Sequence, residues 1–493
     1  MDEASAYRAP IVEALQAYAA GRKASFHVPG HKAGAAFAAE TSAVAWLEAI
    51  GAYDATELPG LDDLHAPLGA IAEAQRLAAD CFGADRTYFL VGGSTAGNLA
   101  AIQAAVGPGE LIVMQRDAHK SAIHALMLRG AGASFVPPDI DESTGLVRGP
   151  SAAAVARALD EHPEAKAVFV TSPNYYGYAV DIAAIAEAAH ARGKPLIVDE
   201  AHGAHFGMHP AFPDSALRQG ADVVIQSTHK MLQALTMGAM LHVRGDRLPA
   251  ERIEALLRML QSSSPSYPIL ASLDWARREL HVRGAEAFEG ALRAIEELHE
   301  ALRPQHRRFA SLRTDDPMKP LLSDRAGALS GYALLDRLAE LGIYTEMATE
   351  RHVVLACSAA TRAEDMSALL AALDEIDLRN PAKKKENATF SSNRYTWGPI
   401  SSSIPVFFDA WGKNSPSAAA DVVEVRLEDA VGMASAEMVV PYPPGIPLLY
   451  PGETITREAA ETLLRLREQG AAVQGPKDRA LRMLRVRRNP FDS

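Results

Sequence analysis

The sequence predicts an α/β protein whose largest domain is built on a mostly parallel sheet of about seven strands covered by helices. Between residues 87 and 243, short apolar runs alternate with Ala-rich segments of helical spacing. The runs are apolar throughout, which is typical of strands buried on both faces of a sheet. Hydrophobic residues make up 48% of the chain and charged residues 22%, so the chain has ample material for a large core.

The seven apolar runs are the expected strands of this sheet. They are TYFLV (87–91), LIVM (111–114), ASFVP (133–137), AVFVT (167–171), PLIVD (195–199), DVVIQS (222–227) and AMLHV (239–243). A representative connection is IAAIAEAAHARG (182–193), whose Ile and Ala positions recur at helical spacing and which ends on a glycine. This alternation of strand and helix predicts that most neighbouring strands run parallel.

The chain of 493 residues is long enough for several domains, and its pattern changes along its length. After Pro304, short strands around GYALLDRLAELG (331–342) indicate a smaller α+β domain. A Lys triplet (383–385) then opens a polar stretch that is typical of a linker. We expect an N-terminal arm (1–45), a large domain (46–300), a small α+β domain (301–380), a linker or surface excursion (381–420) and a C-terminal domain (421–493).

The charge balance and the cysteine count disfavour several classes of protein. The chain has 49 Lys and Arg against 61 Asp and Glu, a formal charge of −12, which argues against a general nucleic-acid binder. Cys81 and Cys357 are the only cysteines, too few for a disulfide scaffold or a CxxC metal site. Neither a signal-peptide pattern nor an apolar run of membrane-spanning length is present. We therefore expect a cytoplasmic protein without membrane contacts.

A glycine-rich segment follows the first predicted strand and has the character of a phosphate site. It reads GGSTAGN (92–98) and leads into a helical stretch, so Ser94 and Thr95 lie beside the amides of a helix N-terminus. The alternative is an ordinary strand-to-helix turn that binds nothing. A Walker A loop is excluded, because no GK[ST] follows.

An acidic residue and a lysine follow two later strands. Asp199 ends PLIVD and begins DEAH (199–202), but a helicase needs a Walker A partner that the chain lacks. Asp199 is therefore either a helix cap or a carboxylate that holds a proton on a buried ring nitrogen. Lys230, after Ser227, is either a solvated surface charge or a lysine whose lowered pKa suits a Schiff base.

Three histidines, His202, His205 and His209, lie close together in HGAHFGMH. Two glycines intervene and no acidic or Cys ligand stands in a recognisable register, so we expect no metal and place His202 near the ligand. The phosphate site, Asp199 and Lys230 are together the parts that a pyridoxal phosphate (PLP) site needs. They would anchor the phosphate, keep the pyridine nitrogen protonated and hold the aldehyde.

Longer motifs identify a family. The chain resembles the Orn/Lys/Arg decarboxylases, PLP enzymes of fold type I (aspartate-aminotransferase-like), over most of residues 7–380 and again over about 420–455. About 25 residues precede the first motif, which is similar to the family's short form without a wing domain. The motifs are FHVPGHK (26–32), DATELPGLDDLHAPLG (54–69), GGSTAGN (92–98), RDAHKS (116–121), VDEAHGAHF (198–206), QSTHKMLQALTMGAMLHV (226–243), SSSPSYPILASLDWAR (262–277), DPMK (316–319) and AEMVVPYPPGIPLLYPGE (436–453).

The resemblance implies a role for each matching residue. Lys230 is similar to the family's Schiff-base lysine, Asp199 to the aspartate on the pyridine nitrogen, and His119 to the imidazole stacked on the ring. The residues around the phosphate and the lysine would be Ser94, Thr95, Ser227 and His229, with Ala201 and His202 beside the ring.

The implied activity is decarboxylation of lysine, ornithine or arginine to CO₂ and a di- or polyamine precursor. Lys230 or His229 would return a proton to Cα. The resemblance also implies a homodimer or higher homo-oligomer with shared active sites. The cationic end of the substrate needs a carboxylate, and the candidates are Glu57, Asp62, Asp63 and Glu437. Solvated loop charges are an equal alternative for the first three.

Two competing functions stay open at this stage. Another fold type I PLP enzyme, such as an aminotransferase or an aldolase, would share the lysine and the aspartate, although the HVPGHK and PYPPGIPL segments argue against it. A catalytically silent PLP-binding regulator would be expected to lack the lysine, the aspartate or the phosphate site, and none of these is missing.

Overall fold

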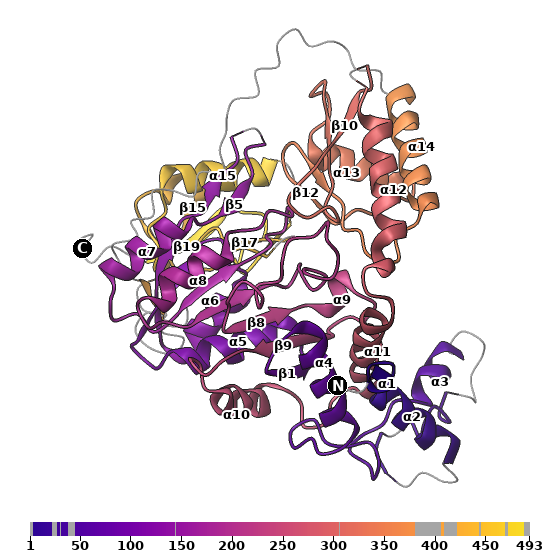
Figure 1. Ribbon diagram of the computed structural model, residues 1–493. Coiled ribbons are helices and arrows are strands. Elements are labelled where there is room, and N and C mark those ends of the chain that lie inside the picture. Colours follow the sequence, from indigo (N-terminus) through magenta and orange to yellow (C-terminus); the bar gives the residue numbers. More distant parts are fainter. Residues whose placement is uncertain are drawn as a thin grey trace. The chain divides into compact units, whose positions relative to one another are not determined.

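The computed structural model describes residues 3–21, 27–29, 31–37, 45–142, 144–304, 306–379, 406–408, 422–442, 445–468 and 472–487 (Figure 1). The chain forms two compact units. The first is Met1–Ala104, Val198–Glu289 and Ser358–Ala360, and the second is Ala105–Ile197, Gly290–Cys357 and Thr361–Ser493. The domain boundaries expected from the sequence remain a prediction.

All seven predicted strands are present in the main sheet. They are β1 (Arg86–Leu90), β2 (Leu111–Gln115), β3 (Gly132–Val136), β6 (Val168–Thr171), β7 (Leu196–Asp199), β8 (Val223–Gln226) and β9 (Ala239–Val243). The strand order is β1-β9-β8-β7-β6-β2-β3-β14. The fold is thus the predicted α/β class with a large, mostly parallel sheet.

The eighth strand, β14 (Val406–Phe407), was not predicted. It pairs antiparallel with β3, where Phe407 lies opposite Gly132. A Cβ at Gly132 would lie 2.6 Å from the Phe407 ring, so only glycine admits this contact. The strand belongs to the expected linker or excursion (381–420), and apart from residues 406–408 that segment lies outside the described residues.

The strands of the first unit direct two chain segments to one edge. β9 lies between β1 and β8 and is antiparallel to both, with Val243 opposite Arg86 on one side and Val223 on the other. β1 and β8 therefore run in the same direction, and their carboxyl ends lie at the same edge. The segments that follow them carry the predicted phosphate site and Lys230.

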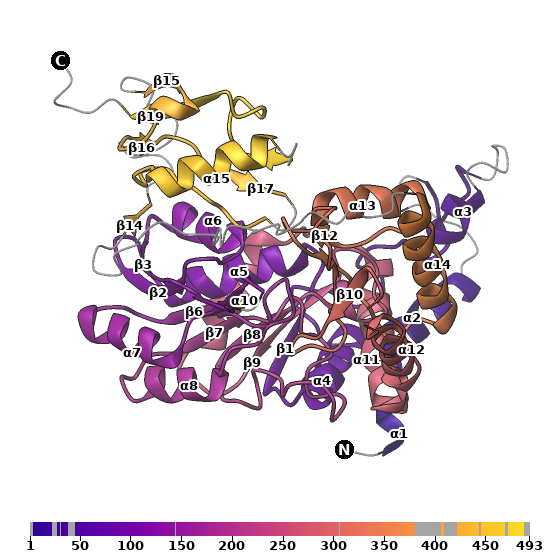
Figure 2. The same cartoon turned by 90° about the horizontal axis from the view of Figure 1, so that it is seen from above.

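In the second unit, β2 pairs in parallel with β3 and β6. Figure 2 shows α6 (Lys120–Arg129) on one side of these strands and α7 (Ala152–Glu161) and α8 (Ile182–His190) on the other. Side chains cap the N-termini of α7 and α8. The Ser151 hydroxyl accepts the N–H of Ala154, and the Asp181 carboxylate accepts the N–H of Ala184. The sequence prediction of a helix from residue 182 is confirmed.

The N-terminal arm is fastened to the first unit by a buried ion pair. Asp274 and Arg277 on α11 (Tyr267–Arg283) are both fully buried, and their side chains contact each other. Asp274 Oδ2 accepts the N–H of Ile11 at 2.9 Å, and Arg277 donates to the carbonyls of Ala6 (3.0 Å) and Arg8 (2.8 Å). Figure 1 shows α1 (Glu3–Ala6) and α2 (Pro10–Gly21) beside α11 as a result.

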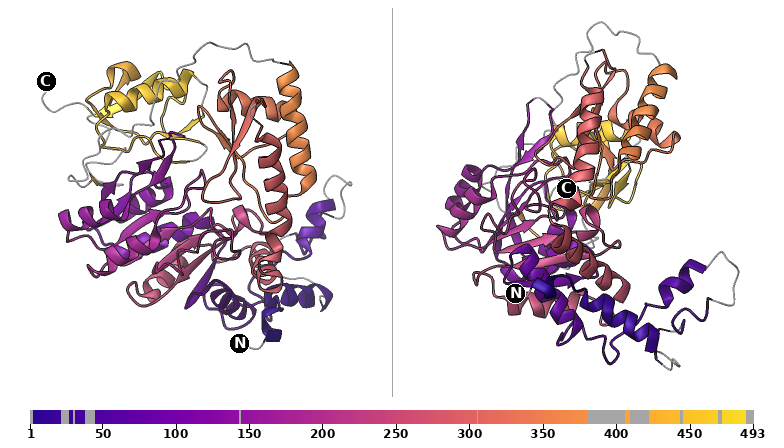
Figure 3. Two further views of the ribbon diagram at one scale, coloured as in Figure 1. Left: turned by 45° about the horizontal axis from the view of Figure 1, so that its top comes forward. Right: turned by 45° about the vertical axis from the view of Figure 1, so that its right-hand side comes forward.

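The small α+β domain is also present. Its strands, in the order β10-β11-β13-β12, form an antiparallel sheet. They are β10 (Phe309–Leu312), β11 (Leu321–Asp324), β12 (Met347–Ala348) and β13 (Val353–Val354). Its helices are α12 (Glu286–Leu302), α13 (Gly331–Glu340) and α14 (Ala363–Arg379), and Figure 3 shows α12 and α14 side by side.

The C-terminal region forms a separate small core. Leu427, Val439, Leu449, Leu463 and Leu484 are buried in it. Its elements are β15 (Val422–Arg426), η3 (Leu427–Asp429), β16 (Ala434–Ser435), β17 (Val440–Pro441), α15 (Arg457–Glu468), β18 (Val473–Gln474) and β19 (Met483–Arg487). The remaining elements of the chain are α3 (Ala45–Gly51), α4 (Ala70–Phe82), α5 (Gly93–Ala105), β4 (Asp139–Ile140), β5 (Val147–Gly149), α9 (Thr228–Met231) and α10 (Ala250–Leu260). Among the described residues, no helix is both long and apolar enough to cross a membrane.

Replacing Arg277 with Met is expected to destabilise the protein by about 3–5 kcal/mol, because Asp274 would remain buried without its cation. The free energy of unfolding in urea measures this. The control is Glu300→Gln, which removes an exposed ion pair with Arg303 and should change stability by less than about 1 kcal/mol. Equal effects of the two substitutions would contradict the assigned role of the buried pair.

Candidate active site

The predicted phosphate site forms where β1 ends and α5 begins. Gly93 has a φ of 73°, which lets the chain turn into the helix, and its N–H donates to the carbonyl of Met237 at 2.9 Å. The hydroxyl of Ser227, directly after β8, donates to Ser94 Oγ at 2.7 Å. Thr95 is exposed in the same first turn of the helix. The first N–H groups of α5 have no partner within the helix, so hydroxyls and amides gather where an anion can bind.

A glycine inside α5 brings the helix close to the strands. A Cβ at Gly97 would lie 2.8 Å from side-chain atoms of both Leu90 on β1 and Ile225 on β8. The absence of a side chain there lets α5 pack directly on the sheet. This close packing also places Asn98, the next residue, in a buried position.

Asp199 ends β7 and is 3% exposed. Its Oδ2 accepts a hydrogen bond from Asn98 Nδ2 at 2.8 Å, and its Oδ1 accepts the N–H of Ala201 at 3.1 Å. Burial raises the pKa of Asp199, and the Asn98 bond, the Lys230 charge and the Ala201 N–H offset only part of this rise. A further positive partner would complete the stabilisation of the carboxylate.

The sequence did not reveal the role of Asn98. The residue lies within the GGSTAGN motif, but no contact was assigned to it. The available signal was its position, since an amide one helical turn after Ser94 in an Ala-rich helix lies on the same helix face.

Lys230 lies in α9, directly after β8, and its Nζ is 3.1 Å from Nε2 of the buried His202. The neighbouring His229 contacts the Gly238 carbonyl with Nδ1 at 3.0 Å, so Nδ1 carries a hydrogen and donates it. Burial lowers the pKa of His229, the Gly238 carbonyl opposes this, and the Lys230 charge lowers it further. His229 is therefore neutral at pH 7.

The residues of the first unit fit pyridoxal phosphate. Thr228 is fully buried, and its hydroxyl oxygen has no hydrogen-bond partner among the described residues. This hydroxyl, with those of Ser94 and Ser227, matches the needs of a phosphate group. Asp199 matches a protonated ring nitrogen, and Lys230 matches an aldehyde.

The three clustered histidines lie in different surroundings. His205 is buried with its ring centroid 4.6 Å from that of Phe212, and His209 Nε2 lies 3.2 Å from a carboxylate oxygen of Glu289. His202 contacts Lys230. In the described part of the chain, no group of three His, Cys, Asp or Glu residues is placed to hold a metal ion.

His119 belongs to the second unit, where it precedes α6 as the helix N-cap. Its Nδ1 accepts the N–H of Ser121 at 3.2 Å and is 2.8 Å from the Ser121 hydroxyl. Its ring edge lies against Gly445 of the C-terminal region. Stacking of His119 on the cofactor ring remains a prediction.

Two of the four candidate substrate carboxylates are used within their own loop. Asp62 accepts the N–H groups of residues 68, 69, 71 and 72 and so caps α4. Burial raises the pKa of Asp62, but these backbone bonds outweigh it and hold the pKa below its ordinary value. Asp63 Oδ1 accepts the N–H of His65 at 2.7 Å. Both carboxylates thus order the loop.

The other two candidates differ from each other. Glu437 uses both oxygens, accepting the N–H of Lys477 at 2.7 Å and of Arg485 at 3.0 Å. Glu57 accepts the Thr56 hydroxyl with Oε2, while its Oε1 is buried without a hydrogen-bond partner among the described residues. Of these four candidates, Glu57 is the one with a buried oxygen that lacks a hydrogen-bond partner among the described residues.

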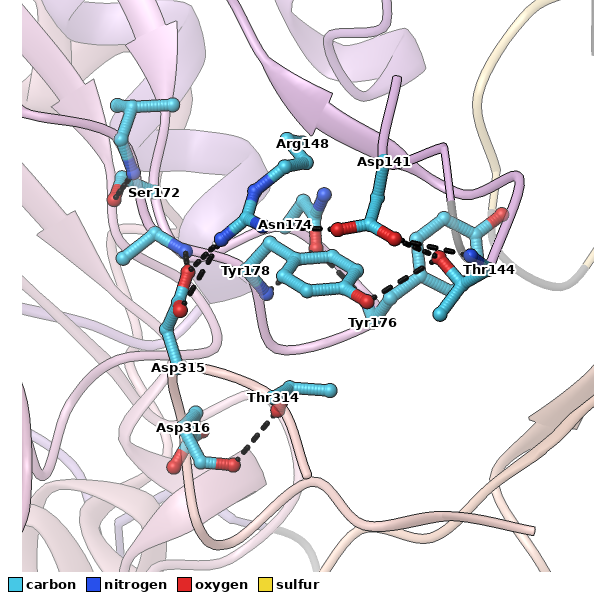
Figure 4. Close-up of polar contacts among 12 residues, drawn as sticks. Asp141, Thr144, Arg148, Ser172, Asn174, Tyr176, Tyr178, Thr314, Asp315 and Asp316 are labelled. Carbon is cyan, nitrogen blue, oxygen red and sulfur yellow. Dashed lines mark hydrogen bonds and ion pairs between the residues drawn. The ribbon is translucent and has the colours of Figure 1, made fainter. Parts of the chain in front are cut away.

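The loop after β6 is an additional structured segment at the carboxyl end of a strand, the edge where open parallel sheets bind ligands (Figure 4). Asn174 organises it. Its Oδ1 accepts the N–H groups of Tyr176 (3.0 Å) and Tyr178 (3.1 Å), and its Nδ2 donates to the Val147 carbonyl at 2.6 Å. The sequence signal was the turn-rich SPNYYG segment (172–177) directly after a predicted strand.

Figure 4 also shows how Arg148 supports this loop. Its guanidinium donates to Asp141 at 3.0 Å and to Asp315 at 3.1 Å, and lies 4.5 Å from the Tyr178 ring centroid. Asp315 in turn accepts the N–H of Ala179 at 3.0 Å. These contacts tie the loop to the β4–β5 hairpin and to the small domain.

Comparison with known proteins gives the same family as the motifs. The family model described as Orn/Lys/Arg decarboxylase, major domain, matches residues 9–324, and the one described as the C-terminal domain matches residues 414–473. The uncharacterized protein YaaO of Bacillus subtilis is 37% identical over 478 residues, 94% of this chain and 96% of that protein.

An arginine decarboxylase of Bacillus subtilis is 33% identical over 492 residues and 98% of both chains. Among solved structures, lysine decarboxylase A from Pseudomonas aeruginosa superposes with a TM-score of 0.77 at 22% identity, covering 98% of this chain and 81% of that one. At that identity, the structural likeness speaks for the fold.

Replacing Asn98 with Ala is expected to weaken pyridoxal phosphate binding about tenfold, because the buried Asp199 loses a hydrogen bond to its charged form. Titration of the apoprotein with the cofactor, followed by absorbance, measures this. Gln219→Ala, which removes an exposed amide, is the control. An unchanged affinity in Asn98→Ala would remove Asn98 from the site.

Proposed function

The chain belongs to the Orn/Lys/Arg decarboxylase family and is a PLP-dependent decarboxylase of a basic amino acid, and we propose that arginine is its preferred substrate. Relatives named arginine decarboxylase support this choice, since they align with nearly the whole chain at higher identity than those named lysine decarboxylase. One observation supports this assignment of the site most strongly. The first unit holds both the contact between Lys230 and His202 and the hydrogen bond between Asn98 and Asp199.

When bound, pyridoxal phosphate supplies an electron sink for the electron pair that remains on Cα after CO₂ departs. Asp199 would hold the proton on the ring nitrogen by accepting its hydrogen bond. Asn98 and the Ala201 N–H fix the direction of that carboxylate. Burial raises the pKa of Asp199, and a protonated ring nitrogen bound beside it would favour the ionised carboxylate.

The remaining residues of the first unit anchor the cofactor and hold protons. Ser94, Thr95 and Ser227 donate to the phosphate together with the N-terminal amides of α5. Lys230 provides the amine for covalent attachment and, at 3.1 Å, can exchange a proton with His202 Nε2. Each turnover consumes one proton at Cα. Lys230 would deliver it, because the neutral His229 donates its ring hydrogen to the Gly238 carbonyl.

Glu57 is the proposed carboxylate for the guanidinium of arginine. Its buried Oε1 has no hydrogen-bond partner among the described residues, and a bidentate guanidinium would satisfy it. Tyr267 lies near this group, since burial raises its pKa and the negative charges of Glu57, Asp62 and Asp63 raise it further. The environment near Glu57 is therefore electronegative and suits a cation.

We also propose a homodimer in which active sites are shared between subunits. Trp46 and Ile50 of α3 and the nearby Tyr53 are 60%, 48% and 45% exposed, a large apolar surface for one segment. Such surfaces commonly mark protein interfaces.

Cys81 and Cys357 are both free thiols, which suits a cytoplasmic location.

Replacing Asp199 with Asn is expected to lower kcat by about 100-fold or more, because the ring nitrogen would lose the carboxylate that keeps it protonated. Steady-state release of CO₂ measures the effect. The exposed Asp214→Asn variant is the control and should retain activity. Near-wild-type turnover in Asp199→Asn would show that the role assigned to this carboxylate is wrong.

A panel of arginine, lysine and ornithine with added cofactor tests the substrate, with amine products identified by mass spectrometry. We expect kcat/KM for arginine to exceed the others by roughly tenfold or more. Formation of α-keto acid in place of CO₂ would instead indicate an aminotransferase.

The Glu57→Gln variant should raise KM for arginine by about tenfold with a smaller change in kcat, because it weakens a contact to the distal end of the substrate. Glu300→Gln, which alters an exposed ion pair with Arg303, is the control. An unchanged KM in Glu57→Gln would exclude Glu57 from the substrate site.

A further inference from the structure

A segment of the C-terminal region lies directly against His119. This segment, residues 445–453, is called the C-terminal strap here. Gly445 has a φ of 97°, and a Cβ on it would lie 3.1 Å from both Cδ2 and Nε2 of His119. The Gly445 carbonyl also accepts the N–H of Lys120 at 3.1 Å. The strap backbone thus contacts one edge of the imidazole and is bonded to the residue that follows it.

The opposite edge of the imidazole is held by α6. Nδ1 of His119 accepts the Ser121 N–H at 3.2 Å and is 2.8 Å from the Ser121 hydroxyl. Because Nδ1 accepts, the neutral ring carries its hydrogen on Nε2, at the edge that faces Gly445. The imidazole is therefore constrained by its own helix at one edge and by the strap at the other.

Arg116, three residues before His119, anchors the strap. Its guanidinium is 1% exposed and donates to the carbonyls of Pro447 (3.0 Å) and Leu448 (3.1 Å), to the Tyr450 hydroxyl (2.6 Å), and to both oxygens of Glu453 (2.9 Å). It also lies 4.0 Å from the centroid of the Tyr450 ring. One short segment, RDAHKS (116–121), therefore binds the strap at two points.

These contacts make the strap and the His119 segment depend on each other. Removing Glu453 would leave Arg116 buried without its anion, which is costly. A lysine cannot replace Arg116, because its ammonium lacks the planar set of donors that serves several acceptors at once. The link extends to the rest of the C-terminal region, since Lys120 Nζ donates to Gln474 on β18 at 2.6 Å.

We propose that the C-terminal strap sets the orientation of the His119 imidazole, so that Gly445, Arg116 and Glu453 are positioning residues for the reaction. The proposal deepens the proposed function and rests on it, specifically on the stacking of His119 against the cofactor ring. It gives the C-terminal region a direct part in catalysis in addition to its own folding.

The first test is Gly445→Ala, which places a methyl group against the ring edge of His119. We expect a changed visible circular dichroism band of the bound cofactor, and a kcat lowered by about tenfold or more with a smaller change in KM. Gly432→Ala is the matched control. Its φ of 84° imposes similar backbone strain, but no atom lies within 4 Å of the added Cβ. If Gly445→Ala and Gly432→Ala change the circular dichroism band of the bound cofactor and kcat to the same extent, the proposal is overturned.

A double-mutant cycle that combines Gly445→Ala with His119→Ala separates the role of the strap from the role of His119. If His119 stacks on the ring, His119→Ala alone changes the cofactor band, and Gly445→Ala then has no further effect on it. If His119→Ala changes the band but Gly445→Ala does not, the role of the strap is wrong while the role of His119 stands. If His119→Ala leaves the band unchanged, the stacking assignment fails and the proposal fails with it.

Glu453→Gln gives an independent variant in case Gly445→Ala does not fold. It loosens the Arg116 anchor without adding a group near the imidazole, and we expect the same direction of change in the cofactor band and in kcat. Glu428→Gln, which alters an exposed ion pair with Arg467 in the same region, is its control. If Glu453→Gln loses thermal stability but keeps the cofactor band and kcat of the wild type, the strap has a structural role only.

Discussion

The site depends on one buried carboxylate. Asp199 ends an apolar strand, where an ionised group is costly unless other groups compensate it. Asn98 and the Ala201 N–H compensate only in part, and burial still raises the pKa of Asp199. The unit therefore holds a buried carboxylate whose ionised form a cationic partner would stabilise further. The close packing of α5 at Gly97 is what brings Asn98 within reach of this anion.

Much of the fold and of this site followed from the sequence, because buried parallel strands read as apolar runs and their ends meet at one edge. That logic singled out Asp199, Ser227 and Lys230, which lie at or just after the ends of β7 and β8. Asn98 escaped it, because its contact comes from a helix face and not from a strand end. β14 escaped as well, since two residues carry no period, and its pairing depends on the missing side chain of Gly132. The carboxylates of Asp62 and Glu437 could not be sorted from that of Glu57, because the backbone groups that occupy them are set only by the folded loops.

Two buried arginines secure segments near opposite ends of the chain in the same manner. Arg277 pairs with Asp274 and donates to the carbonyls of Ala6 and Arg8. Arg116 pairs with Glu453 and donates to two carbonyls of the C-terminal strap. In both cases a planar guanidinium serves an anion and backbone oxygens together, which an ammonium group does less well. The N-terminal segment thus supplies hydrogen-bond acceptors for the buried Arg277, and the C-terminal strap supplies them for the buried Arg116.

Arg116 has a consequence for how the polypeptide can be divided. Its guanidinium donates hydrogen bonds to Pro447, Leu448, Tyr450 and Glu453, which lie between residues 447 and 453. A fragment that stopped after the small domain would retain the cation and lose all of these acceptors. During synthesis on the ribosome the same state exists until residues 447–453 have emerged. The second unit therefore completes the surroundings of Arg116 only once residues 447–453 are present.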